Sequence, residues 1–131
     1  MPAAPPNSRR GLRILFAEDS REFAQVLVHI LQAAGYTVRH APDGLEAWEQ
    51  LFPAVDSYDL LITDNRMPGL GGIELVERAR HAGFAGRIIV YTSGLSAVEH
   101  QRYSAERVDA IVSKAGDPFA LPTIVDAFFP E

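Results

Sequence analysis

The sequence predicts a doubly wound α/β fold, with five parallel strands in the order 2-1-3-4-5 and helices on both faces of the sheet. Short apolar segments alternate with amphipathic segments of helical spacing along the chain, which is typical of a parallel sheet. The 131 residues, 47% of them hydrophobic, suit one domain with a real core. Two of the apolar segments end directly on carboxylates, which places acidic groups at the ligand-binding edge of such a sheet.

The five predicted strands are short runs rich in apolar and β-branched residues. They occupy residues 13–17, 36–40, 59–63, 87–91 and 109–113. The first strand ends at the acidic pair Glu18-Asp19, and the third ends at Asp64. Because the carboxyl ends of parallel strands lie along one edge, these acidic side chains are expected to meet.

The first two helices are predicted from apolar residues at helical spacing. Gly35 is placed to end the first helix, and Asp43-Gly44 is placed to begin the second. The expected core face of the first helix is Phe23, Val26, Leu27, Ile30, Leu31 and Ala34. The expected apolar face of the second helix is Leu45, Trp48, Leu51 and Phe52.

The third helix is predicted from apolar spacing, and the last two are predicted from signals at their first residues. The third has its apolar residues at Ile73, Leu75, Val76 and Ala79. Ser96 and Glu99 have the spacing of a capping box, which predicts a helix from there to about Tyr103. Asp117 followed by Pro118 is an N-cap with proline at the first helical position, so a last helix is expected to run to about residue 128.

The composition excludes several classes of function. The net charge of -5, without clustered lysine and arginine, argues against direct nucleic-acid binding. The chain has no cysteine and therefore no disulfide or thiolate metal site.

Residues 1–11 are predicted to be a flexible arm before a domain of residues 12–131. Charges interrupt the segment after Arg9-Arg10, so no twin-arginine signal is expected. No apolar run approaches the roughly 20 residues of a membrane span, and we expect a cytoplasmic protein without membrane contact.

Five side chains at strand ends are expected to converge at the switch point between the first and third strands. Glu18, Asp19 and Asp64 would meet there, and Thr92 and Lys114 would approach from the ends of the fourth and fifth strands. Three carboxylates about 5 Å apart repel by roughly 3 kcal/mol per pair at an effective dielectric near 20, so cations must lie among them. Lys114 supplies one cation, and an all-oxygen site selects Mg²⁺ or Mn²⁺ as another.

This set of residues predicts phosphoryl transfer. Beside a divalent ion and a lysine, Asp64 would attack phosphorus and become an acyl phosphate. Taken singly, Asp64 could instead cap its loop, Lys114 could form a structural ion pair, and Thr92 could bond to the backbone. Zinc is not expected, because the histidines are predicted to lie away from these strand ends. They are His29, His40, His81 and His100.

Two other functions of the same architecture fit less well. Gly69-Leu70-Gly71 is similar to the start of a dinucleotide-binding fingerprint, but Glu74 stands where its third glycine would be. A flavodoxin-like electron carrier would have its phosphate loop after the first strand, where Glu18-Asp19 would repel phosphate.

In order and context, these residues resemble the signature of the receiver domain of two-component response regulators. The matching motifs are Glu18-Asp19, Asp64 in ITDNRMPGLGGIEL, Thr92 in VYTSG and Lys114 in IVSK. The resemblance covers about residues 12–129 and implies the flavodoxin-like receiver fold. It implies that Asp64 takes a phosphoryl group from a sensor histidine kinase or a histidine phosphotransfer protein and thereby switches binding of a downstream protein partner. Such a domain is not an enzyme for an external substrate, since it catalyses only its own phosphoryl transfer and dephosphorylation.

The resemblance also implies roles for individual residues. The ligands of Mg²⁺ would be Asp19, Asp64, the backbone carbonyl of Arg66 and, through water, Glu18. Lys114 would contact the phosphoryl oxygens. Thr92 would move to hydrogen-bond one of them, with the Ser93 amide nearby.

Three features depart from the family pattern. Ile111 stands where the family has a tyrosine or phenylalanine that swings inward, and its β-branched side chain is stiff, so an altered switch is expected. Ala115 follows Lys114 in place of a cis proline, and a cis bond there would cost roughly 2.5 to 4 kcal/mol, so a trans bond is expected. Arg66 and Gly94 occupy the two positions that, in the family, tune access of water to the acyl phosphate.

We therefore expect a stand-alone or excised receiver domain, since only residues 129–131 follow the last predicted helix. The alternative is a degenerate receiver that acts as a constitutive docking scaffold without phosphorylation, which Ile111 and Ala115 favour. A magnesium-dependent hydrolase of small phosphorylated molecules fits least, because the chain leaves no room for a substrate cap.

Overall fold

The computed structural model describes residues 11–130, so the expected N-terminal arm lies, except for Gly11, outside the described residues. The strands are β1 (Arg13–Ala17), β2 (Thr37–Ala41), β3 (Leu60–Thr63), β4 (Arg87–Thr92) and β5 (Ala110–Ser113). The helices are α1 (Arg21–Ala33), α2 (Gly44–Leu51), α3 (Gly72–His81), α4 (Ala97–Ala105) and α5 (Leu121–Phe128). Two 3₁₀ segments complete the described chain, η1 (Phe52–Ser57) and η2 (Pro118–Ala120).

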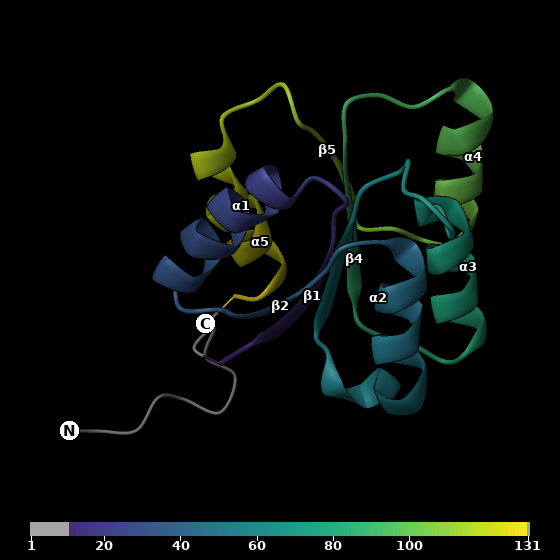
Figure 1. Cartoon of the computed structure of the whole chain (residues 1–131), viewed down its shortest axis with the longest axis horizontal. Helices are drawn as coiled ribbons and strands as arrows, with labels where there is room; N and C mark the ends of the chain where they lie inside the picture. The colour runs from purple at the N-terminus through teal and green to yellow at the C-terminus, as the bar shows by residue number, and fades with distance from the viewer. Residues whose placement is uncertain (1–10, 131) are drawn as a thin grey trace.

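All neighbouring strands are parallel, and their order is β2-β1-β3-β4-β5, which confirms the predicted fold. Figure 1 shows α1 and α5 on one face of the sheet and α2, α3 and α4 on the other. Ala17 at the end of β1 pairs with Thr63 at the end of β3. The residues that follow, Glu18 and Asp64, therefore leave the sheet at the same level.

The core has two layers because alternate strand residues point to opposite faces. Ile14 and Phe16 of β1 pack under α1 and α5, whereas Leu15 and Ala17 pack under α2 and α3. All four residues of β3 are buried, as expected for the central strand of a sheet covered on both faces. Because the central strands are packed on both faces, the positions of their carboxyl ends are fixed.

The buried faces of the first two helices are narrower than predicted. Val26 is 49% exposed because it lies about 100° around α1 from Leu27, the centre of the buried stripe. Ala34 is likewise exposed, because it follows α1 as its C-cap. Leu45 and Phe52 are 48% and 61% exposed, since α2 faces the core through Gly44, Ala47 and Leu51. Trp48 lies between, partly buried and 5.1 Å from the Phe52 ring.

The last helix is divided in two. Asp117 caps the segment as predicted, accepting a hydrogen bond from Phe119 N, but Pro118–Ala120 forms a 3₁₀ turn before α5 begins. Pro122 has no N–H to donate to the Pro118 carbonyl four residues back, so a continuous α-helix would lack that bond. Other boundaries differ from prediction by one or two residues. No helix in the described part of the chain is long and apolar enough to cross a membrane.

Candidate functional site

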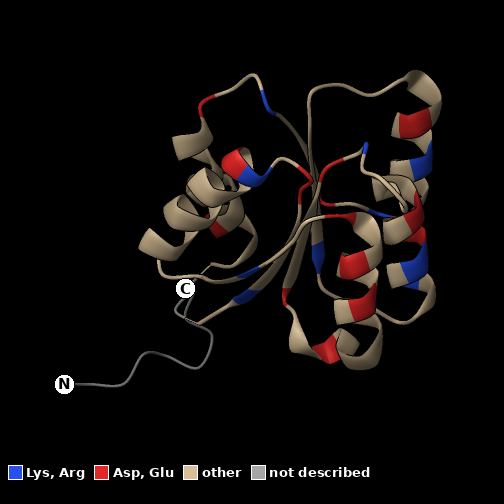
Figure 2. Cartoon of the chain, in the orientation of Figure 1, with Lys and Arg blue, Asp and Glu red and all other residues tan. Residues whose placement is uncertain are grey.

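Three carboxylates meet at the carboxyl edge of the sheet, as the sequence predicts. Oxygen atoms of Glu18, Asp19 and Asp64 lie within 4.8 Å of one another. Glu18 is fully buried, Asp64 is 8% exposed, and Asp19 is exposed at the mouth of the group. Figure 2 shows the acidic segments, in red, where β1 and β3 end. At this spacing each pair of charges repels by roughly 3 kcal/mol at an effective dielectric near 20, so the group attracts cations.

Lys114 is the only lysine of the sequence, and its ammonium group lies among these carboxylates. Its Nζ is 2.6 Å from Glu18 Oε1 and 2.9 Å from Asp64 Oδ2. The backbone fixes the base of this side chain, because Lys114 N donates to the Thr92 carbonyl at 2.9 Å. Burial alone would lower the pKa of Lys114, but its close contacts with the carboxylates of Glu18 and Asp64, and their negative charges, outweigh it and raise the pKa. Lys114 therefore stays a cation at neutral pH.

Glu18 is a buried acid with an incompletely satisfied side chain. Its Oε2 accepts a hydrogen bond of 3.0 Å from Ser20 N. Its Oε1 is buried and has no aligned hydrogen-bond donor among the described residues, so the contact with Lys114 is a close ion pair only. Burial raises the pKa of Glu18, and the favourable effect of Lys114 opposes this only in part.

This donor set fits a hard divalent ion. It offers carboxylate oxygens alone, at a spacing that one ion can bridge, and it includes a buried oxygen that lacks a well-aligned donor. Mg²⁺ and Mn²⁺ prefer such oxygen ligands. Which backbone carbonyl would complete the coordination shell, Arg66 included, stays a prediction.

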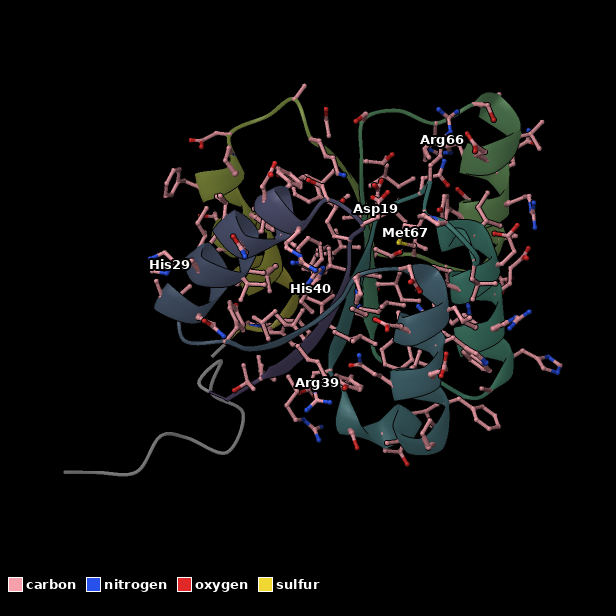
Figure 3. The ribbon with its side chains drawn as sticks, viewed as in Figure 1. Asp19, His29, Arg39, His40, Arg66 and Met67 are labelled. Carbon is pink, nitrogen blue, oxygen red and sulfur yellow. The ribbon has the colours of Figure 1, made fainter. Side chains whose placement is uncertain are left out.

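Thr92 and the loop after β4 form the other wall of the site. Thr92 is 5% exposed, and within residues 11–130 its hydroxyl has only long contacts of 3.4 Å to the N–H and carbonyl of Gly94. A cavity of about 530 Å³ opens beside Asp64, and its lining residues are Asp64, Arg66, Thr92, Ser93, Gly94, Leu95 and Ser96. Figure 3 shows Arg66 beside α4 and Asp19 near the ends of the strands. A larger groove of about 730 Å³, bordered by Trp48 and Arg78, contains none of these residues.

The two remaining departures from the family pattern, Ile111 and Ala115, do not line this cavity. Ile111 is half-buried on β5 and packs against the core cluster under α2 and α3. The Lys114–Ala115 bond is trans, as expected, since no cis peptide occurs among residues 11–130. The effect of Ile111 on switching stays a prediction.

Sequence reasoning missed a polar connection between the site and α4. Asn65 is 5% exposed and bonds through its side chain to Tyr103 at 2.6 Å and to Glu99 at 2.9 Å. The spacing of Glu99 and Tyr103, four residues apart, places both on one helix face and was the available signal. The expectation that every histidine lies away from the strand ends was wrong for His40. Its Nε2 is 2.7 Å from the Glu18 carbonyl, because β2 and β1 end side by side.

Comparison with known proteins gives a consistent result. Residues 14–126 match the family described as the response regulator receiver domain. The response regulator receiver protein CpdR of Brucella abortus (strain 2308) is 35% identical over 114 residues, 87% of this chain and 91% of that protein. The response regulator MprA of Mycobacterium ulcerans (strain Agy99) is 36% identical over 119 residues, 88% of this chain. The chain spans only 47% of the length of MprA.

Solved structures agree with the fold. The chemotaxis protein CheY4 of Vibrio cholerae superposes with a TM-score of 0.79 at 28% identity, covering 89% of this chain and 98% of that one. The receiver domain of the hybrid histidine kinase CckA superposes with a TM-score of 0.74 at 30% identity, covering 90% and 99%.

Proposed function

The chain belongs to the family of response regulator receiver domains, and on that premise we propose that Asp64 accepts a phosphoryl group from the phosphohistidine of a partner protein. The partner would be a sensor histidine kinase or a histidine phosphotransfer protein. The surroundings of Asp64 are the observation that best supports this proposal. Asp64 borders an open cavity, with Lys114 2.9 Å from Oδ2 and the Asn65 N–H 2.7 Å from Oδ1, beside two further carboxylates. These contacts hold a nucleophile in place while leaving it an approach path.

The proposed step is an in-line displacement at phosphorus. An oxygen of Asp64 forms the new O–P bond as the P–N bond of the phosphohistidine breaks, and the electron pair of that bond returns to the imidazole ring. Lys114, held as a cation by its raised pKa, neutralises a phosphoryl oxygen. Thr92, whose hydroxyl has only long contacts, is free to donate to another phosphoryl oxygen.

A divalent ion would complete this charge balance. Asp19, Asp64 and the Arg66 carbonyl would hold Mg²⁺, with Glu18 acting through water, and the ion would supply positive charge to the transferring group. The carboxylates alone oppose the approach of an anionic phosphoryl group. Phosphorylation is therefore proposed to depend on the metal.

The output is proposed to be a change in affinity for a downstream protein, because the phosphoryl group makes different contacts in two conformations of the domain. The protein would act only on its own carboxylate, through phosphoryl transfer and the later hydrolysis of the acyl phosphate. The net charge of -5 disfavours nucleic acid as the direct partner.

The test is intact mass spectrometry of the full chain after incubation with Mg²⁺ and acetyl phosphate. The wild type should gain the mass of one phosphoryl group, and excess EDTA should abolish the gain. Asp64→Asn should gain nothing, whereas the exposed control Asp56→Asn should behave as the wild type. If the wild type gains nothing and also fails to bind beryllofluoride, the protein is a docking scaffold instead.

A further inference from the structure

Asn65 directly follows the proposed acceptor and is held by α4 from two sides. Tyr103 Oη donates a hydrogen bond of 2.6 Å to Asn65 Oδ1. Asn65 Nδ2 donates one of 2.9 Å to Glu99 Oε2. Tyr103 is 1% exposed and Asn65 is 5% exposed, so water does not compete well for the bond between them, whereas the bond to Glu99 is partly buried. The side chain of Asn65 is therefore fixed to the helix rather than to its own loop.

The chemistry of the three groups fixes the direction of these bonds. A carboxylate such as that of Glu99 only accepts hydrogen bonds, so the amide nitrogen of Asn65 must face it. The amide oxygen must then face Tyr103, whose hydroxyl donates. Burial raises the pKa of Tyr103, and the charges of Glu99 and Asp64 raise it further, so the phenol keeps its proton at neutral pH.

The same asparagine also contacts the acceptor carboxylate. Asn65 N donates to Asp64 Oδ1 at 2.7 Å, while Lys114 occupies the other oxygen. Glu99, at the far end, accepts from Ser96 N at 2.8 Å as part of the capping box that begins α4. A continuous set of hydrogen bonds thus runs from the acceptor oxygen to the first turn of α4.

A glycine makes room for this arrangement. A Cβ at position 72 would lie 2.5 Å from the Tyr103 hydroxyl oxygen and 2.2 Å from the Asp64 carbonyl oxygen. The phenol therefore reaches Asn65 through space that only glycine leaves open. Position 111, where the family carries its aromatic residue, holds isoleucine and cannot make such a hydrogen bond.

We propose that Tyr103 and Glu99 act through Asn65 as positioning residues that couple the chemical state of Asp64 to the placement of α4. This inference rests on the proposed function. Converting the carboxylate to an acyl phosphate leaves a carbonyl oxygen that carries less charge and accepts more weakly. The Asn65 N–H contact weakens as a result. Because one buried and one partly buried hydrogen bond join Asn65 to α4, a displacement of Asn65 moves the helix.

The test is hydrogen exchange of the α4 amides, residues 97–105, in the full chain with Mg²⁺ and with or without saturating beryllofluoride. In the wild type the analogue should change α4 exchange rates by about fivefold or more, the size expected of an allosteric coupling. Tyr103→Phe should still bind the analogue, but its α4 response should fall below about twofold. Tyr36→Phe, which loses a different phenol hydrogen bond, to Asp126, should respond as the wild type.

Glu99→Gln provides a second variant. Ser96 N and Asn65 Nδ2 donate to different oxygens of the Glu99 carboxylate, and glutamine replaces one of these oxygens with an NH2 group that cannot accept. It should also lose the α4 response. An equal response in wild type and Tyr103→Phe would overturn the inference, as would a lost response in Tyr36→Phe or an unchanged α4 in the liganded wild type. Failure of the wild type to bind beryllofluoride would instead overturn the proposed function, and the inference with it.

Discussion

Replacing Lys114 with methionine is expected to destabilise the domain by an amount that depends on pH. The substitution keeps the length of the side chain but leaves the fully buried Glu18 without its cation, which lies 2.6 Å away in the wild type. An unpaired buried carboxylate escapes its desolvation cost by taking up a proton. Protonation therefore sets a ceiling on the part of the stability loss that comes from Glu18, beside the loss of the second ion pair of Lys114, with Asp64.

The ceiling follows from the ordinary pKa of Glu18, 4.5. Holding the carboxyl protonated costs about 1.4 kcal/mol for each pH unit above that value, so the ceiling is about 1 kcal/mol at pH 5.5 and about 3 kcal/mol at pH 7. The direction in which the free energy of unfolding changes with pH follows from proton binding. A group whose pKa is raised on folding binds its proton more tightly in the native state, so unfolding free energy falls as pH rises from 4.5 through the folded pKa.

The assay is urea unfolding of wild type and Lys114→Met in EDTA at both pH values. The matched control is Arg102→Met, which removes the same charge from an exposed pair with Glu77 and should cost about 0 to 1 kcal/mol at either pH. A loss for Lys114→Met that is equal at the two pH values, or no larger than the control, would mean that Lys114 does not stabilise the charged form of Glu18.

Three further predictions follow from the same contacts. Gly72→Ala places a Cβ 2.2 Å from the Asp64 carbonyl oxygen and should lower the free energy of unfolding in urea by about 1 to 3 kcal/mol. The control Gly116→Ala, whose Cβ has its nearest contact at 3.5 Å, should lower it far less, and equal losses would show that the space at Gly72 is not needed. Mg²⁺ should raise the melting temperature more at pH 8 than at pH 5.5, because protons compete with the metal for Glu18, whose pKa is raised by burial. Thermal scans with an EDTA control measure this, and an equal rise at both pH values would count against it. Ile111→Tyr should alter the change in hydrogen exchange of β5 that beryllofluoride causes, whereas the control Ile111→Leu should not. If the two variants respond alike, the side chain at position 111 has no part in switching.

Much of the site was predictable because parallel strands fix where their ends lie. Once β1 and β3 are recognised as neighbours, Glu18 and Asp64 must meet, whatever the detailed packing. The hydrogen bond between Asn65 and Tyr103 does not follow from the order of the strands. It depends on how α4 packs above the loop after β3, and on the absence of a side chain at Gly72. Those are features of tertiary packing, and local periodicity does not contain them.

The same limit explains the errors on the helices. Periodicity indicates that a helix has an apolar stripe, but the width of the buried part depends on how closely the sheet approaches. Val26 and Phe52 lie at the margins of their stripes, and the structure leaves both exposed. The contact of His40 with the Glu18 carbonyl likewise depends on a register between β1 and β2 that the sequence does not specify.

Chemical trapping of the acyl phosphate would show whether Asp64 is the residue that carries the phosphoryl group. The protein is phosphorylated with acetyl phosphate and Mg²⁺ and reduced with borohydride, which converts an acyl phosphate of aspartate to homoserine. The account predicts this conversion at Asp64, within the tryptic peptide of residues 40–66, and only in samples that received both reagents. Conversion at Asp19 or at another aspartate, or no conversion in a sample that has gained phosphoryl mass, would contradict it.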